Sequence, residues 1–177
     1  MAVEAVGGAD PGAPVLLASL SKAITGACIA TLVHQKKLAF DWPLSRALGK
    51  FFAAHGKPAD PRVPGITVAQ LLTHRAGFSS NADGEDHSTH TVLEAYLKLH
   101  STREAPQPAY LRLLFERPLQ RDPGTAHAYT NAGYLILGAV IEEATGRPYE
   151  DYCREAVLRP VGASGELHPT WRVMSAY

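Results

Sequence analysis

The sequence predicts an α+β fold in which a short N-terminal β-hairpin is followed mostly by helices. Two short apolar segments, Val3–Gly7 and Pro14–Ala18, lie on either side of the turn-forming residues Gly-Gly-Ala-Asp-Pro-Gly and are predicted to pair as strands. After them, apolar residues recur at spacings of three and four, which is the period of an amphipathic helix. Glycine and proline residues separate these segments and indicate where each helix ends.

The first predicted helix begins at Ser19 and has one apolar face, which consists of Leu20, Ala23, Ile24, Ala27, Cys28, Thr31 and Leu32. Thr67 is a suitable N-cap for the next helix, which Gly77 is expected to close in a left-handed conformation. A capping-box pattern at Thr91–Glu94 predicts a further helix. The segment Pro108–Glu116 predicts another.

Asn131 precedes an almost wholly apolar run, which predicts a fully buried helix that ends at Gly146. The last helix is expected over Pro148–Leu158. The polar segments Gly56–Gly65 and Ser79–His90 are rich in turn-forming residues and are predicted to be surface loops.

The composition is normal for a soluble globular domain and gives no sign of a charged partner. Hydrophobic residues make up 46% of the 177 residues and charged residues 19%, and 17 basic side chains balance 17 acidic ones. Nucleic acids and anionic membranes attract basic surfaces, so we expect a small-molecule or peptide substrate instead. No segment approaches the roughly 18 consecutive apolar residues of a membrane helix, and the N-terminus lacks the pattern of a secretory signal. These features favour the cytoplasm without fixing the compartment.

Cys28 and Cys153 are the two cysteines, and both fall in apolar helical segments. Small apolar thiols pack well in a protein core, so reduced, buried side chains are the preferred interpretation. A disulfide between them is the alternative, and with it an oxidising compartment.

A serine and a lysine at the start of the first predicted helix form the first candidate for chemistry. Ser19 and Lys22 are three residues apart, so they share a helix face and the hydroxyl can meet the amine. Ser21 lacks this pairing, because adjacent helical residues point about 100° apart. The N–H groups of a helix start also favour a developing oxyanion. A surface lysine beside a capping serine is the alternative, since Ser-x-x-Lys arises by chance roughly once in such a chain.

Tyr129 and Asn131 directly precede the apolar helix and form the second candidate. A tyrosine is a poor base at its ordinary pKa of about 10, but a nearby ammonium group favours the phenolate. The amide of Asn131 offers a donor and an acceptor, which suit it to hold Lys22 and a substrate amide. Alternatively, Tyr129 only packs its ring and Asn131 is an ordinary N-cap.

Taken together, these segments resemble the serine β-lactamase and penicillin-binding superfamily, in particular its class C β-lactamase, D-aminopeptidase and family VIII esterase branch. Leu17–Thr25 is similar to the first motif of that family, Ile66–Phe78 to its helix-and-turn signature and Pro123–Tyr134 to its Tyr-x-Asn motif. The similarity continues through Glu142–Gly146 to Leu158–Gly162. Class A enzymes have Ser-Asp-Asn where this chain has Tyr-Thr-Asn, which argues against that branch.

The resemblance implies a serine hydrolase that forms an acyl-enzyme with an ester, amide or lactam carbonyl. Ser19 would be acylated, Lys22 would share its proton, Tyr129 would be the general base and later the acid, and Asn131 would orient the substrate. His74 matches a position that supports the fold in the family, so it is given no catalytic role. No metal or organic cofactor is needed, and we interpret the segment Glu85–His90 as a solvated loop, not a metal site.

The resemblance also implies a β-lactamase/transpeptidase-like fold, with an antiparallel sheet flanked by helices and an all-helical lobe. We expect residues 1–177 to form one incomplete module. In it, residues 1–40 begin the α/β part with the nucleophile helix, residues 41–165 form a mostly helical lobe and residues 166–177 begin the return to the sheet. The third motif of the family, Lys-Thr-Gly or His-x-Gly, does not occur before Tyr177, so the C-terminal sheet strands are expected to be missing.

This expectation leaves two further interpretations open. A second chain, or a second copy in a homo-oligomer, would complete the sheet. The alternative to an enzyme is a non-catalytic penicillin-binding-like sensor or binding module. An inactive fragment that needs a second chain is the other form of this alternative.

Overall fold

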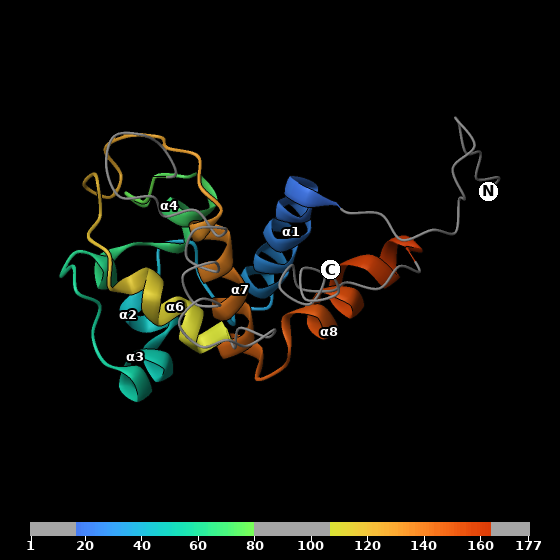
Figure 1. The fold of residues 1–177 in the computed structure, drawn as a ribbon. Coiled ribbons are helices and arrows are strands. Elements are labelled where there is room, and N and C mark those ends of the chain that lie inside the picture. Colours follow the sequence, from blue (N-terminus) through green and yellow to red (C-terminus); the bar gives the residue numbers. More distant parts are fainter. Residues whose placement is uncertain (1–16, 80–106, 164–177) are drawn as a thin grey trace, which may run out of the picture.

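The computed structural model describes residues 17–79 and 107–163, and in these ranges helices pack around one central helix, α7 (Ala132–Thr145) (Figure 1). The helices that contact it are α1 (Ser21–His34), α2 (Leu44–Ala47), α4 (Val68–Leu72), α6 (Gln107–Phe115) and α8 (Tyr149–Cys153). The remaining elements are α3 (Gly49–His55), the 3₁₀ turns η1 (Ala18–Leu20), η2 (Val63–Gly65) and η4 (Arg159–Val161), and a π-helical turn, η3 (Arg154–Leu158).

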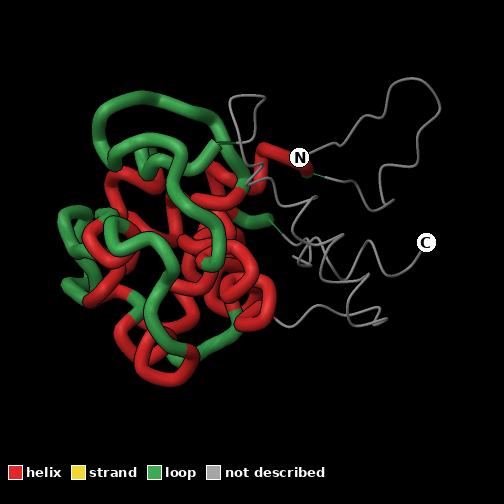
Figure 2. Tube along the Cα trace, turned by 60° about the vertical axis from the view of Figure 1, so that its left-hand side comes forward, coloured by secondary structure: helices red, strands yellow, loops and turns green. Residues whose placement is uncertain are grey.

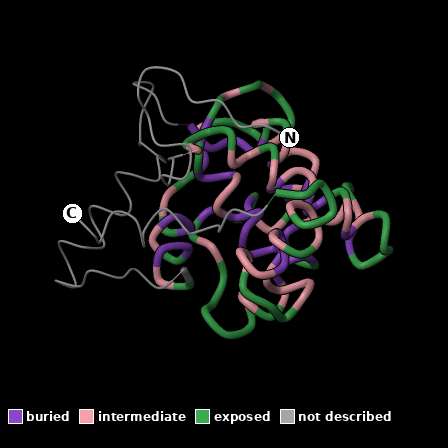
Figure 3. Tube along the Cα trace, turned by 90° about the vertical axis from the view of Figure 1, so that its right-hand side faces the viewer, coloured by how far each residue is buried: buried purple, intermediate pink, exposed green. Residues whose placement is uncertain are grey.

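The central position of α7 follows from its sequence. The prediction of a fully buried helix after Asn131 is confirmed, and the buried residues are Ala132, Gly133, Ile136, Leu137, Gly138, Ala139, Val140 and Ile141. Figure 3 colours the buried parts of the chain purple. Gly133 faces α4, where a Cβ would make ordinary van der Waals contact with Leu71. Gly146 ends the helix in a left-handed conformation, with a φ of 67°.

The predicted N-terminal hairpin lies almost wholly outside the described residues, and its described end differs from the prediction. Ala18 begins the turn η1 instead of ending a strand. Its carbonyl oxygen accepts hydrogen bonds from the backbone N–H and the hydroxyl of Ser21, which curl the chain. In residues 17–79 and 107–163, β pairing is limited to an isolated bridge between Pro43 and Thr67, and Figure 2 shows helices and loops there.

The buried face of α1 is shifted from the predicted one. The structure buries Thr25, Cys28, Ile29 and Leu32, whereas Leu20 is 72% exposed. Ala23 of the predicted face is exposed too, so the shift affects α1 itself as well as the turn η1 that contains Leu20. The prediction was right about the helix and wrong about one edge of its face.

The short helices near the site begin as predicted, but α4 ends differently. Thr67 and Gln70 form a capping box, in which each side chain accepts a hydrogen bond from the backbone N–H of the other residue. Gly77 does not close this helix, which ends at Leu72 and is followed by a left-handed His74. The left-handed Gly77 lies in the next turn, where a Cβ would overlap the carbonyl oxygen of Arg121.

The later helices agree with the predictions. α6 covers the segment predicted over Pro108–Glu116, and α8 with the turn η3 covers the one predicted over Pro148–Leu158. The capping box at Thr91–Glu94 and the loop Ser79–His90, apart from its first residue, lie outside the described residues. No helix in the part of the chain that the structure describes is long and apolar enough to cross a membrane.

The loop Gly56–Gly65 is anchored more firmly than its polar sequence suggested. The carboxylate of Asp60 is buried and accepts hydrogen bonds from the Arg62 guanidinium at 2.6 and 3.0 Å and from the Leu119 N–H at 2.8 Å. Arg62 holds the pKa of Asp60 well below its usual range. Arg62 also donates to Asp122 at 2.6 Å and to the carbonyl oxygen of Leu119 at 2.8 Å. The loop therefore fixes the segment that leads toward Tyr129.

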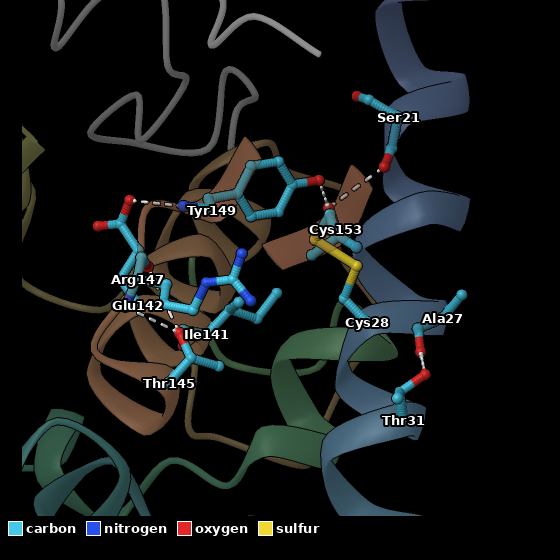
Figure 4. Close-up of a disulfide and its surroundings, with 11 residues drawn as sticks. Ser21, Ala27, Cys28, Thr31, Ile141, Glu142, Thr145, Arg147, Tyr149 and Cys153 are labelled. Atoms are coloured by element: carbon cyan, nitrogen blue, oxygen red, sulfur yellow. Dashed lines mark hydrogen bonds between the residues drawn. A yellow bond between two sulfur atoms is a disulfide. The ribbon is translucent and has the colours of Figure 1, made fainter. Parts of the chain in front are cut away.

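The two cysteines are joined by a disulfide, so the preferred interpretation of free thiols was wrong. Cys28 lies on α1 and Cys153 on α8, with their Cα atoms 5.7 Å apart (Figure 4). Both side chains are fully buried. Both cysteines face the contact between α1 and α8, which the period of either helix does not reveal. The bridge ties the helix that carries Lys22 to α8.

This disulfide is expected to stabilise the fold substantially. It spans 125 residues, and bridges that close loops of this size typically contribute about 2–5 kcal/mol. Replacing both cysteines by alanine should lower the free energy of unfolding in urea by about that amount. Wild-type protein treated with a reductant is the matched control. Alkylation of both thiols in the denatured, unreduced wild-type chain would show that the bridge is absent.

Candidate active site

The candidate nucleophile lies where the turn η1 meets helix α1. Ser19 is in η1 and Lys22 is in the first turn of α1. The Lys22 ammonium donates to the Ser19 hydroxyl, with Nζ and Oγ 3.4 Å apart. This is the contact that the spacing of three residues predicts.

Ser21 has a different environment from Ser19, as the helical geometry predicts. Its hydroxyl donates to the carbonyl oxygen of Ala18 at 2.6 Å. The backbone of Ala18 is left-handed, with a φ of 46°, which costs a residue with a Cβ roughly 1–2 kcal/mol. The hydroxyl of Ser21 thus helps to hold the turn that presents Ser19.

Tyr129 and Asn131 reach this pair from the segment before α7. The Tyr129 hydroxyl is 2.7 Å from the Ser19 hydroxyl, although the two residues are 110 positions apart in sequence. The Asn131 carbonyl oxygen Oδ1 accepts a hydrogen bond from Lys22 at 2.6 Å. The packing of α1 against α7 therefore brings all four predicted site residues together.

Asn131 occupies the N-cap position of α7 without capping the helix through its side chain. The hydroxyl of Thr130, which is buried, accepts the Ala132 N–H at 3.2 Å and forms a local turn before the helix. Sequence reasoning missed this contact of Thr130. The side chain of Asn131 instead binds Lys22.

The electrostatics of the site favour the phenolate form of Tyr129. The hydrogen bond from Lys22 lowers the pKa of the Tyr129 phenol below its ordinary value, and the hydrogen bond from Ser19 and the charge of Lys22 act in the same direction. The Lys22 ammonium also lies 4.9 Å from the centre of the Tyr129 ring. Tyr129 is 46% exposed, so a substrate can approach the phenol.

Backbone hydrogen bonds hold the segment before Tyr129 against the turn that follows α4. The carbonyl oxygen of Gly77 accepts the Gln120 N–H at 3.1 Å, and that of Arg75 accepts the Gly124 N–H at 2.7 Å. The carbonyl oxygen of His74 accepts the Ala128 N–H at 2.8 Å, directly before Tyr129. The segment Glu85–His90, which we interpret from the sequence as a solvated loop and not a metal site, lies outside the described residues.

Ser19, Lys22, Tyr129 and Asn131 thus form one hydrogen-bonded cluster where η1 and α1 meet the start of α7. The sequence profile of the family described as Beta-lactamase matches residues 2–170. The chain therefore belongs to the beta-lactamase family, and the resemblance noted from its motifs is confirmed.

Two curated relatives illustrate the breadth of the family. The chain is 32% identical over 139 residues to a probable fimbrial assembly protein FimD of Dichelobacter nodosus, covering 78% of this chain and 31% of the relative. It is 31% identical over 149 residues to the esterase EstB of Burkholderia gladioli, covering 82% of this chain and 36% of EstB. The chain thus spans about a third of the length of these relatives.

The fold is also that of solved members of this class. A penicillin-binding protein from Bacillus halodurans aligns with a TM-score of 0.59 and 27% identity, over 80% of this chain and 38% of that protein. The predicted β-lactamase/transpeptidase-like fold is therefore confirmed for the part of the chain that the alignment covers.

Proposed function

We propose that the chain carries the nucleophile of a serine hydrolase, and that Ser19 becomes acylated by an ester, amide or lactam substrate. The observation that carries this proposal is the 2.7 Å contact between the hydroxyls of Ser19 and Tyr129, with Lys22 donating to the same serine. Covalent catalysis generally uses a nucleophile within hydrogen-bond reach of a base. A third group orients that base.

Tyr129 accepts and then donates the proton in both halves of the proposed cycle. The Tyr129 phenolate takes the proton of Ser19 as the Ser19 Oγ bonds to the carbonyl carbon. Tyr129 then gives this proton to the leaving group as the scissile bond breaks, which leaves an acyl ester on Ser19. A water molecule gives a proton to Tyr129 and attacks the ester, and Ser19 regains its proton as the acid is released.

Lys22 and Asn131 have supporting roles in this proposal. The Lys22 ammonium stabilises the phenolate of Tyr129 by charge, which agrees with the lowered pKa of that phenol. Asn131 fixes the ammonium through its 2.6 Å hydrogen bond. Its amide nitrogen is a donor suited to the carbonyl group of a substrate.

We take an ester as the first substrate class to test, because one relative carries the name esterase. No step of the proposed cycle uses a metal or cofactor. Completion of the fold by a second chain or by a second copy of this chain stays a prediction.

The experiment is covalent labelling with a serine-directed phosphonate, followed by peptide mapping. Ser19 is expected to be the one modified serine, because its hydroxyl contacts both Tyr129 and Lys22. The Ser21→Ala variant is the matched control and should be labelled like the wild type. Labelling of Ser21, or equal labelling of a Ser19→Ala variant, would refute the assignment.

A further inference from the structure

His74 occupies a position at the end of α4 that normally favours glycine. The Arg75 N–H donates to the carbonyl oxygen of Gln70 at 2.7 Å, and the His74 N–H donates to that of Leu71 at 3.2 Å. This pair of bonds is a Schellman motif, in which the left-handed residue is usually glycine. Here the left-handed residue is His74, with a φ of 55°. A non-glycine residue in such a conformation is strained, and strain of this kind persists where surrounding contacts require the side chain.

The contacts of His74 lie on both sides of Tyr129. The His74 carbonyl oxygen accepts the Ala128 N–H at 2.8 Å, and its ring nitrogen Nδ1 accepts the Thr130 N–H at 3.3 Å. Between these two anchors, the His74 and Tyr129 rings lie 4.6 Å apart, centre to centre. One residue therefore fixes the backbone before and after the phenol and also packs against its ring.

The hydrogen bond from Thr130 requires an unprotonated Nδ1, and the surroundings of His74 favour this neutral form. Burial lowers the pKa of His74 below its ordinary value, and electrostatic interactions with His127 and Lys22 lower it further. Among the described residues, the titratable groups around the ring are Lys22 from α1, His127 and Tyr129 from the segment before α7, and Tyr134 from α7.

We propose that neutral His74 is a positioning residue that holds the phenol of Tyr129 within reach of Ser19 and Lys22. The inference rests on the proposed role of Tyr129 as the base. His74 itself touches none of the reacting atoms in that cycle. It acts by limiting the positions that Tyr129 can adopt, and displacement of a catalytic group by about 1 Å can cost about 100-fold in rate.

Two variants separate this role from a structural one. The His74→Gly variant relieves the left-handed strain and removes both the ring and the Nδ1 acceptor. The His74→Asn variant tolerates the same backbone conformation, and its Oδ1 atom replaces Nδ1 as acceptor for the Thr130 N–H. His127→Asn is the matched control, because His127 is an exposed histidine whose ring lies 5.7 Å from that of His74.

The primary measurement is the pKa of the Tyr129 phenol, followed by NMR of carbon-13-labelled tyrosine and assigned with a Tyr129→Phe variant. In His74→Gly this pKa should rise toward the ordinary value of 10.0, because the phenol leaves Lys22 and Ser19. The kcat for an activated ester should fall about 10- to 100-fold, while the melting temperature stays close to that of the wild type. The His74→Asn variant should restore most of the wild-type kcat and of the lowered Tyr129 pKa. The His127→Asn variant should change neither.

An unchanged Tyr129 pKa in folded His74→Gly protein, or an unchanged kcat, would overturn the inference. So would a failure of His74→Asn to recover either property. Failure of the proposed function gives a different result, namely turnover that persists in Ser19→Ala. In that case the pKa of Tyr129 in the two His74 variants still decides whether His74 positions the phenol.

Discussion

Replacing Ser19 by alanine is expected to abolish turnover of an activated ester, with a loss in kcat of about 10⁴-fold or more. The hydroxyl oxygen of Ser19 forms the covalent bond in the proposed cycle, so the acyl-enzyme cannot form at this position without it. Ser19 is exposed, so the free energy of unfolding should change by no more than about 0.5 kcal/mol. Steady-state rates and urea unfolding curves of the same preparations measure the two effects.

The Ser21→Ala variant is the control for this loss. It removes a hydroxyl two positions away that donates to the carbonyl oxygen of Ala18. It should retain turnover, with at most a small loss of stability at the turn η1. Turnover in Ser19→Ala at the wild-type rate would assign the chemistry to another residue.

Replacing Tyr129 by phenylalanine is expected to lower kcat by about 10²–10⁴-fold, which is the usual contribution of a general acid–base group. The substitution removes a single oxygen, the one that lies 2.7 Å from the Ser19 hydroxyl. The ring, with its contact to His74, is kept. Since Tyr129 is 46% exposed, stability should change little.

Tyr149→Phe is the matched control, because it removes a tyrosine hydroxyl away from the site. That hydroxyl lies 2.8 Å from the hydroxyl of Thr25, in the contact between α8 and α1. Its loss should lower the free energy of unfolding by about 1 kcal/mol and leave turnover unchanged. If Tyr129→Phe kept the wild-type kcat, a different group would have to be the base.

The parts of the site that depend on one helix could be predicted from the sequence. The pairing of Ser19 with Lys22 follows from helical spacing, and so does the exclusion of Ser21. The contact between Ser19 and Tyr129 could not be predicted in this way. It depends on how α1 packs against α7, across 110 positions of sequence, and only the resemblance to a family suggested it.

Two features escaped prediction because local rules allowed more than one answer. Asn131 occupies the N-cap position of α7, but its amide binds Lys22 and not the helix N–H groups, while Thr130 accepts the Ala132 N–H. Gly77 was the obvious left-handed residue after α4, yet His74 takes that position and compensates its strain by contacts with the segment around Tyr129.

The disulfide illustrates the same limit for the fold. Cys28 and Cys153 each lie on a buried helix face, which the apolar pattern indicates. Whether the two faces meet depends on the packing of α1 against α8. This is a long-range property that the period of either helix does not contain.

The most direct test of the central claim is to detect the acyl-enzyme during turnover. The protein would be mixed with a nitrophenyl ester, quenched in acid during the steady state, and its intact mass and peptides measured. We predict one added acyl group, located on Ser19, that is absent from Ser19→Ala and disappears once the substrate is exhausted. Turnover without an acyl group on Ser19, and undiminished in Ser19→Ala, would contradict the account.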